Sequence, residues 1–427
     1  MTMTNERSAT SGAGDNRTPR RRDLDVLLLD GQYRQALTCM RALARSGLRV
    51  GAAACVSEAS AAPSLRSRMC TMRASLPDLG SDPDVYVDAL LDLLDTIAVA
   101  VVLPAHDGSI EALRLRRPEV ESRCALPLAS NEALDIAVSK ERTLAVAATQ
   151  GIATPESLAV TSEGDLRSAL AAVGIPAVLK PVQSWVTSRQ GEGTRLTSVL
   201  VRDAEEAART FGWIQAVGGS VLVQPWLPGI REACTLFYAE GRVWARFGQV
   251  SHREWPALGG VSVLCESIEL DPRIAAWSER LVEAIGLEGC AMVEFRRDVA
   301  GRPVLMEVNP RLGATTALAL RSGVDFPHLL YSWAVGEPLT SVTAYRVGRR
   351  LRWLTGEAWY LRSVFGQQGS PEIPTRRRAV ATVMSDFVAR PSHVDVWSLR
   401  DPWPGFVETK AAAKEFAMPR IERWIGR

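Results

Sequence analysis

The stretch that decides the fold is Cys290–Arg311, which reads CAMVEFRRDVAGRPVLMEVNPR. Two segments of alternating apolar residues flank a turn centred on Ala300 and Gly301, and this pattern predicts a β-hairpin. In that register Glu294 lies directly opposite Glu307, so their side chains share one face of the hairpin. Like charges in this arrangement are unfavourable unless a cation joins them. The hairpin therefore predicts a cation site.

The residues around the two glutamates indicate which cation it is. By the two-residue period of a strand, Leu305 and Asn309 share the face of Glu307. Two carboxylates and an amide oxygen form a set of hard oxygen ligands suited to Mg²⁺, and Arg311 adds a guanidinium fork for phosphate or carboxylate. The alternative is a surface hairpin whose glutamates pair with neighbouring arginines such as Arg296.

Lysine is rare in this chain, and its few positions are informative. Of the 50 basic residues only Lys140, Lys180, Lys410 and Lys414 are lysine. Lys180 lies at the end of the apolar strand expected at 177–181, and Lys140 lies on a helix before it. Ammonium groups are compact charges that suit phosphate oxygens. For each lysine the alternative is an exposed, solvated side chain.

Two further stretches fit a nucleotide. Residues 221–229, VLVQPWLPG, form an apolar strand that runs into a proline-punctuated linker. There the carbonyl of Pro225 and the N–H of Leu227 suit the edge of adenine, although a strand ending in a plain turn has the same pattern. The segment 180–196 fits either a phosphate flap or a hairpin loop. Its polar residues and glycines are Ser184, Thr187, Ser188, Gly191, Gly193 and Thr194.

The chain divides into four parts. Residues 1–22 are polar and arginine-rich, which predicts a disordered tail. Residues 23–130 alternate apolar runs with helical patterns and predict an open parallel α/β domain. Residues 131–345 read as an α+β domain, and 346–427 as a small extension rich in tryptophan and arginine that packs over the rest.

The elements expected in 23–130 begin with a βαβ unit. Its first βα turn lacks GxGxxG, so it gives no reason to expect a dinucleotide. The predicted strands are 25–29, 48–55, 98–103 and 125–128, and the predicted helices include 33–45 and 83–96.

Composition excludes several functional classes. The 427 residues carry 50 basic and 48 acidic side chains, so there is no electrostatic case for nucleic acid as the main partner. The longest apolar run, 97–105, is too short to span a membrane. Seven cysteines without a CxxC pair predict reduced thiols in a cytoplasm, and four scattered histidines give no zinc pattern.

Together these motifs resemble the ATP-grasp superfamily, which includes D-alanine–D-alanine ligase, biotin carboxylase and carbamoyl-phosphate synthetase large chains. The likeness covers roughly residues 23 to 345 and is nearest to the predicted ATP-grasp carboligases and L-amino-acid ligases. The resemblance implies that Glu294, Glu307 and Asn309 hold the Mg²⁺ ions on the ATP phosphates. It also implies that Arg311 contacts phosphate or the acyl intermediate. The two phosphate lysines of the family correspond to Lys140 and Lys180.

Other family positions are also matched. The adenine hinge corresponds to Gln224, Pro225, Trp226 and Leu227, where an acidic residue and a tyrosine are more usual than Pro225 and Trp226. The family's Pro-Gly-x-Glu pattern makes Glu232 a ribose contact. The loop over triphosphate and acceptor corresponds to Arg253, Gly259, Gly260 and Ser262, with Arg253 in a catalytic role beside Lys180 and Arg311. The turn that faces substrate corresponds to Gly313, Thr315 and Thr316. The flap lacks the dense glycine run of the family.

The resemblance implies an α/β and α+β protein with a Rossmann-like domain, an ATP-grasp domain and a C-terminal extension. The implied activity is a cytoplasmic, biosynthetic, ADP-forming ligase that phosphorylates a carboxylate and couples the acylphosphate to an amine. The resemblance also implies ATP and two Mg²⁺ ions, which Mn²⁺ can replace, as cofactors. It implies a small-molecule acid and an amine as substrates, and it is compatible with a homodimer. The alternatives are a bicarbonate-activating carboxylase or carbamoyl-forming component and a non-catalytic ATP-binding protein.

Overall fold

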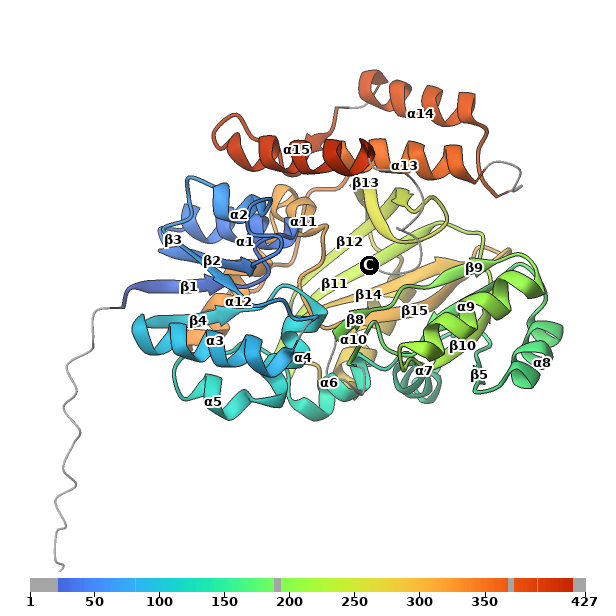
Figure 1. Ribbon diagram of the computed structural model, residues 1–427, viewed down its shortest axis with the longest axis horizontal. Coiled ribbons are helices and arrows are strands. Elements are labelled where there is room, and N and C mark those ends of the chain that lie inside the picture. The colour runs from blue at the N-terminus through green and yellow to red at the C-terminus, as the bar shows by residue number, and fades with distance from the viewer. Residues whose placement is uncertain (1–21, 81, 188–192, 368–371, 390, 418–427) are drawn as a thin grey trace, which may run out of the picture.

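The computed structural model describes residues 22–80, 82–187, 193–367, 372–389 and 391–417. Most of the tail expected at 1–22 lies outside these ranges, as do Ser188 and Gly191 of the expected flap. Figure 1 shows an N-terminal α/β part and a smaller α/β part on either side of a large central sheet, with a layer of C-terminal helices across one end. Within the described ranges, no helix combines the length and apolar character needed to cross a membrane.

The N-terminal part is an open parallel sheet, as the sequence predicts. Its strand order is β3-β2-β1-β4, and β3 was not among the predicted strands. Helices cover it, and therefore β2 and β4 are buried throughout and read as continuous apolar runs. The strand expected at 125–128 is reduced to a single bridge between Ala125 and Val101. Pro127, which has no N–H, cannot extend that pairing. The strands are β1 Leu24–Leu28, β2 Val50–Cys55, β3 Met72–Leu76 and β4 Val99–Leu103. The helices are α1 Arg34–Arg45, α2 Pro63–Arg66, α3 Pro83–Thr96, α4 Asp107–Leu115 and α5 Arg117–Glu121.

A smaller four-stranded sheet follows, in the order β5-β10-β6-β9. Helices α8 and α9 pack on it around Leu166, Phe211 and Ile214. The separate hairpin β7–β8 leaves this part and reaches the N-terminal domain, where Gly193 N–H donates to the carbonyl of Gly80 at 3.1 Å. The strands are β5 Leu158–Val160, β6 Ala177–Pro181, β7 Trp185–Thr187, β8 Gly193–Arg195, β9 Val199–Val201 and β10 Val221–Pro225. The helices are α6 Asn131–Ala137, α7 Lys140–Thr149, α8 Glu163–Val173 and α9 Ala204–Ala216.

The central sheet has seven strands in the order β15-β14-β11-β12-β13-β16-β17. Its back face packs on α10 through Leu281 and Val282, and α11 and α12 join it to the N-terminal domain. The strands are β11 Arg231–Ala239, β12 Arg242–Trp255, β13 Val261–Ser267, β14 Gly289–Arg297, β15 Pro303–Asn309, β16 Arg350–Arg352 and β17 His393–Val394. The helices are α10 Pro272–Ile285, α11 Thr316–Ser322 and α12 Phe326–Val335.

The β14–β15 hairpin has the predicted pairing of Glu294 with Glu307, but one expectation about it is wrong. The register shifts after this pair, so that Phe295 pairs with Leu305 and Met306 is the extra residue of a β-bulge. Because of the bulge, Leu305 does not share the face of the glutamates. Its side chain is fully buried with Phe295 in the core behind the sheet.

The C-terminal extension is tied to both other parts. It adds β16 and β17 to the central sheet and forms helices α13 Leu354–Gly366, α14 Arg376–Ala389 and α15 Trp403–Ala417. Arg41 of α1 donates to Asp401 at 3.0 Å, which fixes the start of α15 to the N-terminal domain. Trp353 and Trp359 pack as expected, since both contact Trp255 of β12, whereas Trp403 is 64% exposed.

Candidate active site

Glu294 and Glu307 lie across from one another on adjacent strands, and Asn309 spans both. Its Nδ2 is 3.3 Å from Glu294 Oε1 and 3.4 Å from Glu307 Oε1. Turning the amide over presents Oδ1 instead, which completes a set of three hard oxygen ligands. The described residues contain no group of three His, Cys, Asp or Glu that could hold a metal. A cation held by this pair would take its remaining ligands from Asn309, water or phosphate, as Mg²⁺ commonly does.

The two carboxylates differ in their electrostatic surroundings. Burial raises the pKa of Glu294, although Arg231 opposes the rise. Burial also acts to raise the pKa of Glu307, but Lys140 and Lys180 outweigh it and hold that pKa below its usual value. Glu307 therefore stays ionised, as a metal ligand must.

Both expected phosphate lysines converge on this pair. Lys140 is the first residue of α7, and its Nζ lies 3.8 Å from Glu307 Oε2 and 3.0 Å from Ser184 Oγ. Lys180 on β6 donates to the carbonyl of Met306, the bulge residue, at 3.2 Å. Burial lowers the pKa of Lys180 to about 8. The site therefore gathers two ammonium groups around a carboxylate pair, as phosphoryl transfer requires.

Arg231 is the site residue that sequence reasoning missed. Its Nη1 lies 3.1 Å from Glu294 Oε2, and its Nε lies 2.8 Å from Glu254 Oε1. The guanidinium also donates to Ser262 Oγ at 2.8 Å and to the carbonyl of Gly260 at 2.7 Å. Alternation along β11 was the available signal, because Arg231 is two residues from a position opposite Glu294.

The same alternation corrects the placement of Glu232. Ala233 pairs with Glu294, so Arg231 and Ala233 face the site and Glu232 faces away from it. Arg297 holds the Glu232 carboxylate at 2.6 and 3.1 Å. The structure therefore does not bring Glu232 to the carboxylate pair, and its role as a ribose contact stays a prediction.

The hinge segment has free polar atoms where a base could bind. Gln224 is 1% exposed and donates through Nε2 to Ser157 Oγ at 2.8 Å, while its Oε1 has no partner among the described residues. Nε1 of Trp226 is likewise buried without a partner there. Unsatisfied buried atoms are costly, so this segment fits a ligand with both donors and acceptors, as adenine has. Pro225 and Trp226 differ from the residues that are usual in the family, but they leave these donor and acceptor atoms in place.

Arg253, expected in a catalytic role, points away from this site. Its guanidinium makes a two-point pair with Glu357 of α13 at 2.9 and 2.8 Å and a further bond with Asp386 of α14. The next residue, Glu254, turns to the other side of the strand and binds Arg231. Arg253 therefore joins β12 to the C-terminal helices.

A stability measurement separates these two roles for Arg253. We expect Glu357→Gln to lower the free energy of unfolding by about 3–5 kcal/mol, because it removes the carboxylate that two buried guanidinium groups, those of Arg253 and Arg352, share. Glu279→Gln, which removes the exposed partner of Arg246, is the control and should cost about 1 kcal/mol or less. Denaturant unfolding measures both. If Glu357→Gln is as stable as the control, Arg253 does not anchor the extension.

Arg311 also has a partner that the sequence did not reveal. It makes a two-point pair with Asp107 of the N-terminal domain, at 2.5 and 2.9 Å. It lies two residues beyond Asn309, so the pair draws the N-terminal domain against the edge of the metal site. Gly313 follows closely, and a Cβ there would approach Met292 Sδ to 2.9 Å. Thr315 and Thr316 begin α11 behind this turn.

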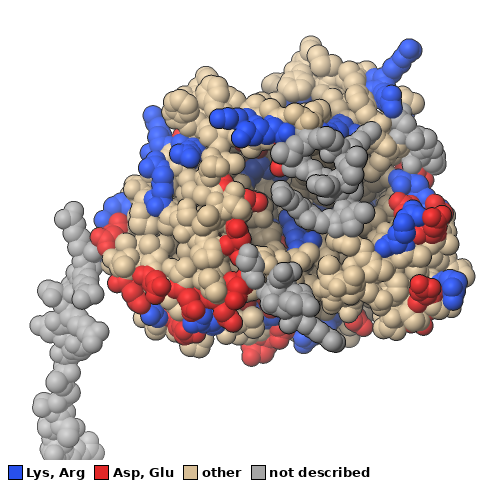
Figure 2. Space-filling model, in the orientation of Figure 1, with Lys and Arg blue, Asp and Glu red and all other residues tan. Residues whose placement is uncertain are grey.

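The loop between β12 and β13 lies over Arg231. Gly260 has φ 140°, and a Cβ there would collide with the carbonyl oxygen of Trp255. Its own carbonyl accepts from Arg231, as does the hydroxyl of Ser262. The backbone of the loop that contains Gly259 and Gly260 thus contacts Arg231 of the candidate site. In Figure 2 the molecule is hollowed between the N-terminal part and the smaller part, and basic side chains lie in the hollow.

A buried carboxylate in the N-terminal domain has a measurable consequence. Asp30 follows β1, is 2% exposed, and accepts hydrogen bonds from Ala105 N–H at 2.9 Å and Ser109 Oγ at 2.6 Å. Burial raises the pKa of Asp30 from 3.8 to about 6 despite these bonds. Between these pH values the folded chain therefore binds a proton that the unfolded chain has lost.

We expect stability to fall through this window as pH rises from 4 to 6, with Asp30 contributing about 3 kcal/mol. Asp30→Asn keeps an acceptor oxygen and abolishes the titration, so its stability relative to the natural chain should rise by that amount between pH 4 and pH 7. Unfolding curves of both proteins at the two pH values measure the difference. A constant difference would contradict the raised pKa.

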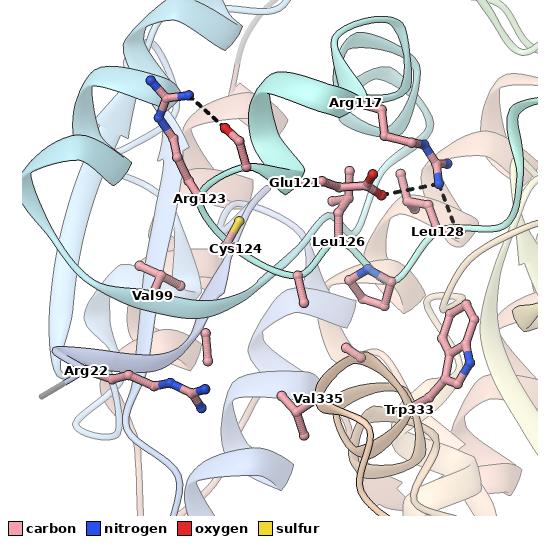
Figure 3. Close-up of a pocket in the computed structure, with 15 residues that line it drawn as sticks. Arg22, Val99, Arg117, Glu121, Arg123, Cys124, Leu126, Leu128, Trp333 and Val335 are labelled. Carbon is pink, nitrogen blue, oxygen red and sulfur yellow. Dashed lines mark hydrogen bonds and ion pairs between the residues drawn. The ribbon is translucent and has the colours of Figure 1, made fainter. Parts of the chain in front are cut away.

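Two cavities lie outside the metal pair. One, of about 760 Å³, lies between the segment 121–128 and α12, with Arg117, Arg123 and Trp333 in its wall (Figure 3). The other, of about 690 Å³, lies between β12 and the helices α13 and α14, and Arg253 lines it. Neither cavity is lined by the two glutamates or the two lysines of the candidate site. The candidate site is therefore identified by the contacts among its side chains and not by a cavity.

Comparisons with known proteins bear on this geometry. Residues 250–357 match the family model "ATP-grasp in the biosynthetic pathway with Ter operon". The chain has the fold of the biotin carboxylase domain of Hydrogenobacter thermophilus 2-oxoglutarate carboxylase, solved with MgADP and bicarbonate (TM-score 0.61, 17% identity, 77% of this chain and 73% of that one). The chain thus resembles ATP-grasp proteins in its fold, and residues 250–357 match one of their family models. The fold class predicted from the sequence is thereby confirmed.

Two further proteins that this chain resembles are ligases by name. The D-alanine–D-alanine ligase of Stutzerimonas stutzeri is 26% identical over 214 residues, which are 46% of this chain and 64% of the relative. The L-amino acid ligase of Bacillus licheniformis shares the fold at a TM-score of 0.54 with 18% identity, covering 75% of this chain and 76% of that one. The chain spans somewhat less than two thirds of the curated relatives that it matches.

Proposed function

We propose that this protein is an ADP-forming ligase that activates a small carboxylic acid as its acylphosphate and joins it to an amine. The observation that carries the proposal is the carboxylate pair of Glu294 and Glu307, spanned by Asn309 and flanked by Lys140 and Lys180. The comparisons support it, since relatives with this fold include named ligases. A non-catalytic ATP-binding protein would have no need of both carboxylates.

The chemistry proceeds in two steps. An oxygen of the acid attacks the γ-phosphorus of ATP, the bond to the β-phosphate oxygen breaks, and ADP leaves. The amine nitrogen then attacks the acyl carbon, phosphate leaves with the C–O bond electrons, and the nitrogen loses a proton. Mg²⁺ bound by Glu294, Glu307 and Asn309 would neutralise charge on the ATP phosphates.

This chain's own residues have defined parts in these steps. Lys140 and Lys180 place positive charge where it develops on the transferred phosphoryl group. Gln224 and Leu227 hold adenine, and the loop with Gly260 covers the phosphates. Arg311 orients the acid at the boundary with the N-terminal domain. Water must be excluded from the acylphosphate, which is the task of the β7–β8 hairpin.

Several finer expectations belong to the same proposal. They are a second Mg²⁺ ion, replacement of Mg²⁺ by Mn²⁺, a homodimer, a cytoplasmic location and the substrate contacts of Gly259, Ser262, Gly313 and Thr315. The domain boundaries at 130 and 345 likewise remain proposals. Each follows from the resemblance and is open to direct measurement.

The test is product identity. The protein is incubated with ATP, Mg²⁺ and pooled acids and amines, and ADP is resolved from AMP. Acid-dependent ADP and phosphate support the proposal, whereas AMP and pyrophosphate contradict it. ADP that depends on bicarbonate alone would assign the carboxylase alternative. Tight ATP binding without turnover on any pool would favour the binding protein.

A further inference from the structure

The loops that follow β1 and β4 lie beside the candidate active site, because Asp107 at the end of the second loop pairs with Arg311. The place where these two loops part is called the crevice below. Because β1 lies between β2 and β4, the loops that leave the carboxyl ends of β1 and β4 diverge, and open α/β sheets bind ligands at such a point. These loops are 29–33 and 104–107. The hairpin β7–β8 lies against them, since a Cβ at Gly108 would approach the ring of Trp185 to 3.1 Å.

Asp30 joins the loops 29–33 and 104–107 by hydrogen bonds, and its own backbone has an unfavourable conformation. It has φ 60°, a left-handed conformation that is uncommon outside glycine and that clusters at functional sites. Its carboxylate accepts from Ala105 N–H and Ser109 Oγ. These bonds occupy Asp30, so its charge is not free to bind a ligand.

His106 contributes an unused donor to this crevice. It is 3% exposed, stacks on Tyr33 with ring centroids 4.5 Å apart, and meets the edge of Trp185 at 6.0 Å. Its Nδ1 accepts from Gly108 N–H at 3.2 Å, so the proton of the neutral ring is on Nε2. Burial lowers the pKa of His106 to about 3, which keeps it neutral. Nε2 has no partner among the described residues.

The charges that face His106 are also unsuited to a positive ligand. Arg195 of β8 and Arg311 both act on it, together with Asp107. Asp107 is fully engaged by Arg311, whereas Arg195 is exposed and has no ion-pair partner among the described residues. Of the three charged side chains that act on His106, the one without an ion-pair partner among the described residues is therefore a cation.

We propose that the acid substrate carries a hydroxyl or carbonyl oxygen on the carbon next to its reacting carboxylate, and that this oxygen accepts from His106 Nε2–H in this crevice while the reacting carboxylate lies on the side of Glu307. An acid that presents an ammonium group to the crevice is discriminated against. The proposal rests on the proposed function and narrows it, because it separates this chain from ligases that take an amino acid as the activated acid. A site built to donate to an oxygen rejects an analogue without one strongly.

Matched acids and a chemical trap test this without knowledge of the amine. Hydroxylamine captures an acylphosphate as the hydroxamate and releases phosphate. We compare L-malate with L-aspartate, and L-lactate with L-alanine, in the presence of Mg·ATP. The hydroxy acids should exceed their amino counterparts in kcat/KM by at least about tenfold. Equal rates, or a preference for the amino acids, would overturn the proposal and leave the ligase assignment standing. No acid-dependent ADP with any compound would instead remove the ligase assignment, and this inference with it.

Two variants test whether the preference for hydroxy acids over amino acids depends on residues of the crevice. His106→Phe retains a ring to stack on Tyr33 and removes the donor, so the preference for malate should fall at least about tenfold without a change in ATP affinity. His328→Phe, at an exposed position of α12, is the matched control. Arg195→Gln lies on the surface and leaves the fold undisturbed, and it should weaken malate more than lactate. A preference that survives in both His106→Phe and Arg195→Gln would place recognition elsewhere and overturn the assignment.

Discussion

Glu307→Gln is expected to lower acid-dependent ADP formation by at least about 10³-fold, with the fold intact. Glutamine retains the shape of the side chain and loses its charge. The cation site then has a single carboxylate, and the ammonium groups of Lys140 and Lys180 lose the anion that orients them. The measurement is phosphate release at saturating ATP across a Mg²⁺ titration, with circular dichroism to establish folding.

Glu283→Gln is the matched control for this variant, because Glu283 is an exposed glutamate on α10, on the other side of the central sheet. It should retain the turnover and the Mg²⁺ dependence of the natural chain. Wild-type turnover in Glu307→Gln, with the same Mg²⁺ requirement, would remove Glu307 from the metal site and leave the surface-hairpin interpretation in its place.

Lys180→Met is expected to lower the same rate by about 10²–10³-fold, since it removes one preorganised cation from the transferring phosphoryl group. Lys180 is 5% exposed, and methionine fills most of its volume without a charge. The loss should lie mainly in kcat, because the charge is needed most when it develops in the transition state. Steady-state kinetics with varied ATP separates kcat from KM.

The scarcity of lysine supplies the control for that variant. Lys414→Met changes an exposed lysine of α15 and should leave both constants unchanged. An effect confined to the KM for ATP in Lys180→Met would assign Lys180 to ground-state binding alone. Equal kinetics in the two variants would show that Lys180 is a structural residue of β6.

The sequence alone was sufficient for the hairpin and the carboxylate pair. Both depend on local rules: alternation places side chains by parity, and a short turn fixes which residues pair. It was also sufficient for the parallel character of the N-terminal sheet, since buried parallel strands read as continuous apolar runs. The position of Leu305 shows the limit of these rules. A one-residue bulge at Met306 reversed its face, and nothing in the alternation signals a bulge.

The sequence did not predict which way a side chain points when that depends on a strand or helix far away in the chain. Glu232 and Arg231 are neighbours, and only the pairing of Ala233 with Glu294 decides which of them faces the site. Glu232 matched the family pattern by its spacing, but Arg231, which matched no pattern, is the residue that contacts Glu294. Arg253 is a similar case, because its direction depends on Glu357, which lies in an extension that the resemblance did not cover.

The sequence by itself determined the local chemistry of this protein: a carboxylate pair, an amide two residues on, and lysines kept at positions where most basic residues are arginine. Only the tertiary structure decided which charges meet them. Arg311 and Asp107 are separated by 204 residues and form one ion pair, and His106 was given no role until the fold left its Nε2 buried and unpartnered. Pairing within a hairpin and helix capping act between near neighbours in sequence. Charge pairing and burial depend on distances in space, which the assembled sheets and domains alone set.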